Sequence, residues 1–482
     1  MFLQNTRGRP LQFSITAACG AGFLLFGYDQ GIFGGLLDND HFLRAFGNPS
    51  TTIQGQIVAT YDIGCIIGTL VSMFLGDKLG RRRCILTGCS ILIVGAILQT
   101  AAYSLPPMIV GRVVAGIGNG MNTIACPVLQ SETARANDRG KLIVLQLVLN
   151  ILGIVISNWM NFGFTYIPNS SVSWRFPLAS QCFFALVTMS LVFFTPESPR
   201  WLAMKHRASE AQQILSRQLD KAHDDPIIVD EIQGLVASVH HEAEVQQSTP
   251  LKEIFTRNSK QQTLRRMLLG AGTAFFQQVG GTNFIAYYLP IVLTRSVGLS
   301  NRLALILSAC DSMSLMFWGA VAALQIDRFG RKKLLLMGVT GSSICFALVA
   351  VGLRYGGPEN KGMSILAVKM RNIGTSFATT VNWLFVYVVV VATPIGIETI
   401  GWRYYTLYAI FNFLFIPIIW HFYVETANLS LEQVDRLYEI NHDAGKNMSW
   451  SEAYKTARVE NPAGLGDPVK VGAESEHCEV IT

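Results

Sequence analysis

Two residues of opposite charge, Asp29 and Arg112, lie within long apolar stretches of the sequence. Asp29 falls about 16 residues into the first apolar run, roughly 24 Å of helical rise from its start, and Arg112 lies about five residues from one end of the fourth. A carboxylate in hydrocarbon should be protonated or paired, and an arginine at matching depth is the obvious partner. The pair could bind and release a proton, or it could be a permanent ion pair that only holds two helices together.

Side-chain amides gather in a later apolar run, at Gln277, Gln278 and Asn283. Gly280 and Gly281 lie between them and should weaken the helix, so that both sets of amides could face one cavity. Amide donors and acceptors suit a neutral, hydroxyl-rich solute. The alternative is that these amides only join helices to each other.

The elements that must position these residues are membrane-spanning helices. Half of the chain is hydrophobic and only 15% is charged. Each apolar run is long enough to cross a hydrocarbon core of about 30 Å, and each must satisfy its own backbone, so an all-α membrane protein is expected. The runs lie at about 13–37, 53–75, 84–104, 107–130, 142–164, 176–195, 267–294, 303–325, 334–353, 373–398 and 402–424.

Basic residues cluster after the second, fourth and eighth runs, which places these loops and the N-terminus in the cytoplasm. Asp29 and Arg112 then both belong to the outer half of the membrane. The clusters are Lys78 with Arg81, Arg82 and Arg83; Arg135, Arg139 and Lys141; and Arg328, Arg331, Lys332 and Lys333.

A polar stretch after Trp201 and an internal sequence repeat divide the chain into two halves. Gly-Asp-Lys-Leu-Gly-Arg-Arg-Arg from residue 76 returns as Asp-Arg-Phe-Gly-Arg-Lys-Lys from residue 327, which indicates duplicated helical halves. We therefore expect two pseudo-symmetric bundles of six and five apparent spans. The predicted domains are an N-terminal six-helix bundle (1–200), cytoplasmic linker helices (201–266), a C-terminal bundle (267–424) and a cytoplasmic tail (425–482).

The second half is too short for six helices. Asp77 lies 62 positions before Arg139, whereas Asp327 lies 44 positions before Arg371, and the shortfall of 18 is about one helix. The gap falls near 356–371, a segment too charged and short to cross as a helix. Three explanations are open. The number of membrane crossings could become odd, so that the C-terminal tail leaves on the other side of the membrane. Alternatively, the segment folds back along a protein-lined path, or the chain is truncated.

Several motifs occur in order between about Phe13 and Tyr438. They are Phe26-Gly27-Tyr28-Asp29-Gln30-Gly31, Gly111-Arg112, Pro127 and Glu132 with Arg139-Gly140, Pro196-Glu197-Ser198-Pro199-Arg200-Trp201-Leu202, and Gln277-Gln278 with Gly281, Asn283 and Tyr287-Tyr288. Together they resemble the sugar porter family of the major facilitator superfamily, and specifically fungal proton-coupled sugar or polyol transporters. By this resemblance the missing helix is the tenth.

The resemblance implies transport of a sugar or polyol by alternating access, with Asp29 as a proton carrier paired to Arg112. It implies solute contacts at Gln277, Gln278, Asn283, Asn382 and Trp383, and an extracellular gate at Tyr287 and Tyr288. Gln146 is adjacent to the family's glutamine position, which Leu147 occupies, and could substitute only after a rotation of about 100°. A cytoplasmic gate network is implied at Asp77, Arg81, Glu132, Arg139, Glu197, Arg200, Asp327, Arg331 and Glu425.

Other functions stay open within this fold: a facilitative uniporter, a transport-dead nutrient sensor and an inactive truncated transporter. The gate charges could instead be solvated loop residues. An enzyme is not expected, because the sequence has no phosphate loop or nucleophile elbow, and no metal or cofactor is expected because its cysteines lack ligand spacing. The expected partners are the solute, a proton and the lipid bilayer, without nucleic acid, for a monomeric multi-pass protein of the plasma membrane.

Overall fold

The computed structural model describes most of the first half of the chain and parts of the second. The described residues are 6–37, 39–134, 139–167, 170–248, 265, 268–269, 271–272, 275–276, 289–291, 293–294, 298–329, 331–355, 402–424, 437–438, 440–441 and 448–460.

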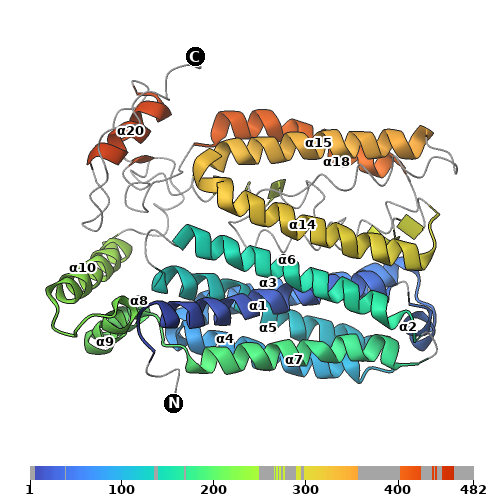
Figure 1. The fold of residues 1–482 in the computed structure, drawn as a ribbon, viewed down its shortest axis with the longest axis horizontal. Helices are drawn as coiled ribbons and strands as arrows, with labels where there is room; N and C mark the ends of the chain where they lie inside the picture. The colour runs from blue at the N-terminus through green and yellow to red at the C-terminus, as the bar shows by residue number, and fades with distance from the viewer. Residues whose placement is uncertain are drawn as a thin grey trace.

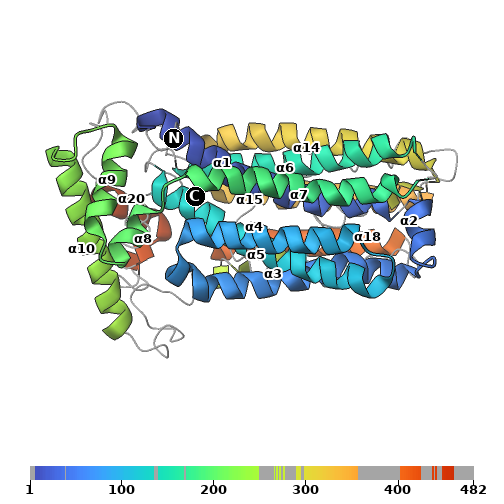
Figure 2. The same ribbon diagram turned by 90° about the horizontal axis from the view of Figure 1, so that it is seen from below.

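The described elements are helices, as the sequence predicts, and the long ones run along one common axis (Figures 1 and 2). They are α1 (Gly8–Leu36), α2 (Asp40–Ala45), α3 (Thr51–Leu79), α4 (Arg81–Thr100), α5 (Leu105–Thr133), α6 (Arg139–Phe164), α7 (Val172–Phe194), α8 (Pro199–Met204), α9 (Ala208–Leu219), α10 (Pro226–Ser248), α14 (Asn301–Phe329), α15 (Arg331–Tyr355), α18 (Trp402–Phe422) and α20 (Trp450–Glu460).

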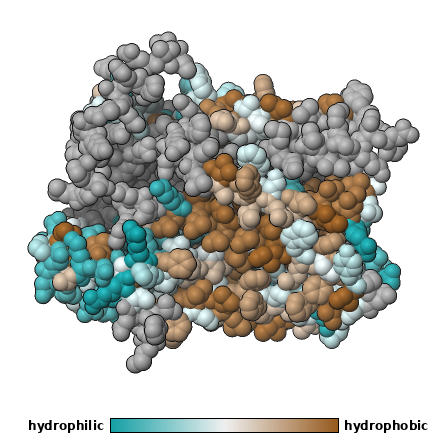
Figure 3. All heavy atoms as spheres, viewed as in Figure 1, coloured by the Kyte–Doolittle hydropathy of each residue, from teal (hydrophilic) through white to brown (hydrophobic). Residues whose placement is uncertain are grey.

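Six of the described helices are long and apolar enough to cross a membrane: α1, α3, α4, α6, α7 and α14. Large apolar side chains such as Phe74, Phe183, Phe317 and Trp420 are exposed along the bundle. Figure 3 shows this apolar band between polar ends. Because exposed apolar surface on this scale suits lipid rather than water, the band is the membrane-facing belt.

Close helix packing in the first half depends on glycine. Gly64 and Gly68 of α3 face Gly116 and Gly120 of α5 so closely that a Cβ atom on Gly116 would lie 2.2 Å from the carbonyl oxygen of Tyr61. Small residues let helix backbones approach, which matters in lipid because apolar side chains gain little there by association. The Gly-rich stretch of α5 is therefore a close-packing face.

The helices α15 and α18 run antiparallel. The hydroxyl of Ser343 donates to the carbonyl oxygen of Ala409 at 3.0 Å, and Val339 packs against Phe415 and Ile419. The end of α15 and the start of α18 therefore share one end of the bundle, and α18 finishes at the other. A hydrophobic cluster that includes Val424 and Trp450 then holds α20 near the C-terminal end of α18.

The tail helix α20 lies at the same end of the bundle as α8, α9 and α10 (Figures 1 and 2). An odd number of crossings would have placed it at the opposite end, so the parity change considered from the sequence is wrong for the described helices. The predicted gap near 356–371 and most of the predicted runs at 267–294 and 373–398 lie outside the described residues. The predicted domain limits stay predictions.

The glycine contact between α3 and α5 predicts a selective loss of stability. Gly116→Ala should lower the free energy of unfolding by about 1–3 kcal/mol, because the new methyl group meets a backbone carbonyl that cannot move alone. Gly163→Ala is the matched control, since a Cβ on this α6 glycine meets nothing within 4 Å. It should be neutral or stabilise by up to about 1 kcal/mol. Thermal unfolding of the purified proteins measures both, and equal melting temperatures would contradict the packing argument.

Candidate functional site

A buried polar cluster lies between α1, α3 and α5. It contains Asp29 of α1, Tyr61 and Asp62 of α3, and Arg112 of α5, each exposed by 1% or less. Charged groups are rarely buried to this degree in a membrane bundle unless they act on solutes or ions. The four residues are therefore the first candidates for function.

Asp29 is held by a phenol. The hydroxyl of Tyr61 donates to Oδ2 of Asp29 at 2.8 Å, while Oδ1 has no hydrogen-bond partner. A donor of this kind stabilises the ionised carboxylate. The remaining oxygen leaves the carboxyl group able to take up a proton.

Arg112 lies between two aromatic rings. Its guanidinium carbon is 4.1 Å from the ring centroid of Phe33 and 4.3 Å from that of Tyr61. Its Nε and Nη2 atoms donate to the carbonyl oxygens of Ile57 and Val58 at 3.2 and 3.1 Å, and Nη1 has no partner. Ring faces and helix carbonyls thus stabilise the buried cation without a carboxylate in contact.

The sequence predicts an ion pair between Asp29 and Arg112, and the predicted direct contact is absent. Tyr61 takes its place, because its hydroxyl binds Asp29 and its ring covers the guanidinium. The charge of Arg112 still acts on Asp29 through space. The two residues therefore belong to one cluster, joined through an aromatic side chain.

Sequence reasoning missed both Tyr61 and Asp62. The available signal is Asp62 itself, an acidic residue inside the apolar run at about 53–75. Asp62 has neither carboxylate oxygen in a hydrogen bond. Tyr61 could not have been recognised from the sequence, because a buried tyrosine is ordinary in such a helix.

Part of the predicted cytoplasmic gate network forms at the ends of α3, α4 and α5. Arg81 binds Glu132 through Nε and Nη2, both at 3.1 Å, and binds Asp77 through Nη1 at 3.0 Å. The bidentate geometry fixes the start of α4 against the end of α5. These three predicted residues are brought together.

Glu197 binds at the same place, and we call Arg81, Glu132 and Glu197 together the corner. Its Oε1 accepts the backbone N–H groups of Arg81 and Ser198 at 3.0 Å, and the N–H of Arg82 also points to the carboxylate. Gly80 connects α3 to α4 with φ of 90°, and a Cβ there would lie 2.6 Å from Oε2. Burial raises the pKa of Glu197, although the backbone N–H donors oppose this effect.

The other predicted gate residues are Arg200, Arg139, Asp327, Arg331 and Glu425. Arg200 belongs to α8, whose neighbouring residue Trp201 donates to the carbonyl oxygen of Asp77 at 3.0 Å. The side chains of Arg139, Asp327 and Arg331, which belong to α6, α14 and α15, and the residue Glu425 lie outside the described parts of the structure.

Gln146 is buried in α6, and its two amide atoms have no hydrogen-bond partner. Asn150, one turn later, faces α1 and donates to the carbonyl oxygen of Phe23 at 3.4 Å, so Gln146 shares the face toward α1. Its neighbour Leu147 packs with an apolar cluster of α1, α4 and α5. The predicted solute and gate residues Gln277, Gln278, Asn283, Tyr287, Tyr288, Asn382 and Trp383 lie outside the described residues.

The family model of the sugar (and other) transporters matches residues 13–370 and 365–438. The chain belongs to this family. The two matched segments meet at 365–370, within the region where the sequence predicts the gap. The transporter is therefore a multi-pass membrane protein with the major facilitator fold, as predicted, and not an enzyme.

Curated relatives are similar over nearly the whole transporter. The MFS-type transporter oryC of Aspergillus oryzae is 37% identical, with 90% of this chain and 86% of the relative covered. The sugar transporter STL1 of Saccharomyces cerevisiae is 34% identical, with 91% and 83% covered. The xylose transporter XylE from E. coli, in a partially occluded inward open conformation, has a TM-score of 0.72 at 23% identity, covering 88% of this chain and 100% of that one.

The Arg81 contacts predict that Arg81→Ala destabilises the transporter. Loss of the bidentate bond leaves Glu132 without its partner and should cost about 1–3 kcal/mol. Arg83→Ala is the control, because this exposed arginine is two positions further on and should change stability by no more than about 0.5 kcal/mol. Thermal unfolding of both variants measures the difference, which would be nil if Arg81 were only a solvated charge.

The raised pKa of Glu197 predicts a pH-dependent stability difference from Glu197→Gln. A raised pKa means that the folded protein binds the proton more tightly than the unfolded chain does. Lowering the pH from neutral toward the ordinary glutamate value of about 4.3 should therefore stabilise the wild type relative to the variant. Melting temperatures of both proteins across this range test the sign, and a difference that is constant or falls with acidification would contradict it.

Proposed function

We propose that this transporter carries a sugar or polyol by alternating access in symport with protons, with Asp29 as the proton carrier and Arg112 as its basic partner. The observation that carries the proposal is the buried carboxylate of Asp29, which depends on one phenol and one nearby cation. Such a group can change its protonation whenever the helices around it move.

The proton step follows from the position of these residues on three different helices. While Tyr61 donates to Asp29 and Arg112 lies nearby, the ionised carboxylate is tolerated in the apolar interior. A shift of α1 against α3 and α5 would remove both interactions and leave the charge isolated. The carboxylate must then bind a proton, because an isolated buried ion costs several kcal/mol.

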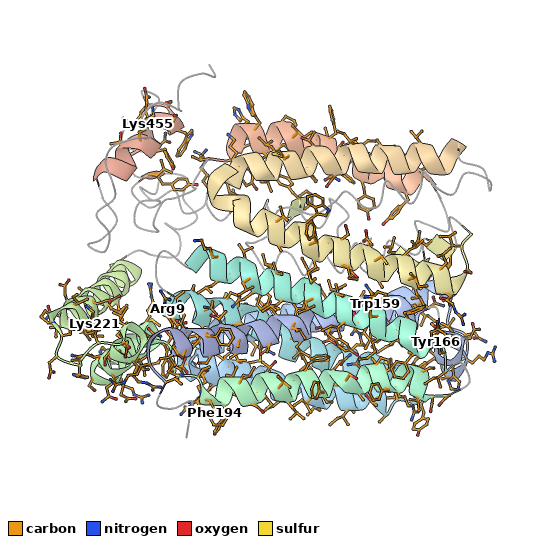
Figure 4. All side chains as sticks on the ribbon, viewed as in Figure 1. Arg9, Trp159, Tyr166, Phe194, Lys221 and Lys455 are labelled. Atoms are coloured by element: carbon orange, nitrogen blue, oxygen red, sulfur yellow. The ribbon has the colours of Figure 1, made fainter. Side chains whose placement is uncertain are left out.

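Alternating access needs an interface between the two halves that can open, and α6 and α14 supply one. Asn158 donates to the hydroxyl of Ser312 at 3.3 Å, and Trp159 donates to the sulfur of Met313 at 3.4 Å. Arg302 lies over the ring of Tyr166. Trp159 and Tyr166 are at the end of α6 opposite α9 and Lys221 (Figure 4). These contacts are weak enough to break during a transport cycle.

The solute class is proposed from the relatives and from the predicted amides. The relatives include a hexose transporter of Kluyveromyces lactis and a probable inositol transporter of Arabidopsis thaliana, and a protein of similar structure is a proton:xylose symporter. We further propose a plasma-membrane location, a monomer, and the solute and gate roles predicted from the sequence. The corner at Arg81, Glu132 and Glu197 would strengthen the closed cytoplasmic side.

The proposal predicts that Asp29→Asn uncouples transport. The variant should lose at least about tenfold of its acid-stimulated accumulation, because the amide cannot bind a proton, and should keep solute exchange that needs no proton gradient. Uptake and counterflow of labelled D-glucose, D-xylose, glycerol and myo-inositol in proteoliposomes measure both. Asp40→Asn is the control, since this acid is exposed at the start of α2.

The other functions give distinct outcomes. Unchanged accumulation by Asp29→Asn would end the proton role, and wild-type uptake that ignores the gradient would identify a uniporter. No uptake of any of the four solutes, combined with nutrient signalling in cells, would identify a sensor. No uptake and no signalling would identify an inactive chain.

A further inference from the structure

Asp62 is a second buried acid in the cluster, and nothing in the proposed proton step uses it. It is 1% exposed in the middle of α3. Neither of its carboxylate oxygens has a hydrogen-bond partner, in contrast to Asp29, which accepts from Tyr61. A carboxyl group placed this way is costly in its ionised form, so its presence calls for a reason.

The geometry of α3 directs Asp62 toward Arg112. Side chains of a helix lean toward its N-terminus, and Val58 precedes Asp62 by one turn on the same face. The guanidinium of Arg112 is bound at this level, to the carbonyl oxygens of Ile57 and Val58. Its Nη1 atom has no partner, and its charge acts on Asp62 as it does on Asp29.

The charges in the cluster do not balance if both acids are ionised. Two carboxylates would face one cation. The other titratable groups that interact with them are neutral in their ordinary forms: Tyr28, Tyr61, Cys65 and Cys182. A net negative charge in this apolar interior costs several kcal/mol, so one acid must hold a proton. Asp29 has a donor that favours its ionised form, and Asp62 has none.

We propose that Asp62 is a second proton-binding residue of the transport machinery, which shares the charge of Arg112 with Asp29. In this conformation Asp62 holds the proton and Asp29 is ionised. When Asp29 separates from Tyr61 and takes up a proton from the outer side, Asp62 releases its own proton to the cytoplasmic side and becomes the carboxylate that faces Arg112. On return the proton of Asp29 passes to Asp62, so each cycle carries one proton inward. The buried charge then stays balanced in both states. This inference rests on the proposed proton symport.

Asp62→Asn tests the inference, because an amide imitates a carboxyl group that is protonated at all times. If Asp62 were permanently neutral and only structural, the variant would transport like the wild type. If Asp62 exchanges protons, the variant should lose at least about tenfold of its proton-driven accumulation and its pH profile should flatten, while counterflow continues. Ser72→Ala is the matched control, a buried polar residue of α3 outside the cluster.

The measurements use the full-length protein in proteoliposomes with labelled D-glucose, D-xylose, glycerol and myo-inositol. Wild-type accumulation and pH profile in Asp62→Asn would overturn the inference, and a loss in Asp29→Asn alone would still support the proposed function. If Asp62→Asn does not fold, Asp62→Glu decides: it should keep proton-driven uptake with a displaced pH midpoint. An unchanged midpoint would overturn the inference. Wild-type uptake that ignores the gradient would instead overturn the symport on which it rests.

Discussion

The structure depends on the absence of hydrogen-bond partners in the lipid interior. Polar groups inside the bundle must be satisfied by the protein itself, and ionised ones need a partner of opposite charge. The cluster of Asp29, Tyr61, Asp62 and Arg112 meets this requirement only in part. Its remaining unpaired atoms make its protonation sensitive to small movements of α1, α3 and α5. The same constraint that makes the cluster costly makes it suitable for coupling a proton to transport.

The tight glycine contacts between α3 and α5 serve this cluster. Because Gly64 and Gly116 bring the two backbones together, the side chain of Arg112 can reach the carbonyl oxygens of Ile57 and Val58. At the cytoplasmic side, Arg81 and Glu197 fix the connection from α3 to α4. These contacts hold α3, α4 and α5 together around the buried charges, and α6 and α14 provide the joint to the second half.

The relatives agree with the motifs on the family and the fold. Among them are a hexose transporter and a probable inositol transporter. The second matched segment of the family model begins at residue 365, near the predicted gap. The described helices nevertheless place α20 at the same end of the bundle as the linker helices.

By itself, the sequence determined the membrane class, the helical fold and the family, whereas the contact of Arg81 with Glu132 was implied only by the resemblance. Long apolar runs and motif residues a few positions apart report these features locally, because helix period and lipid thickness fix them. Only the tertiary structure decided that Tyr61 joins Asp29 to Arg112, that Asp62 belongs to the same cluster, and that α20 lies at the same end of the bundle as the linker helices. These depend on which faces of distant helices meet, and spacing along one chain does not specify side-chain partners across three helices.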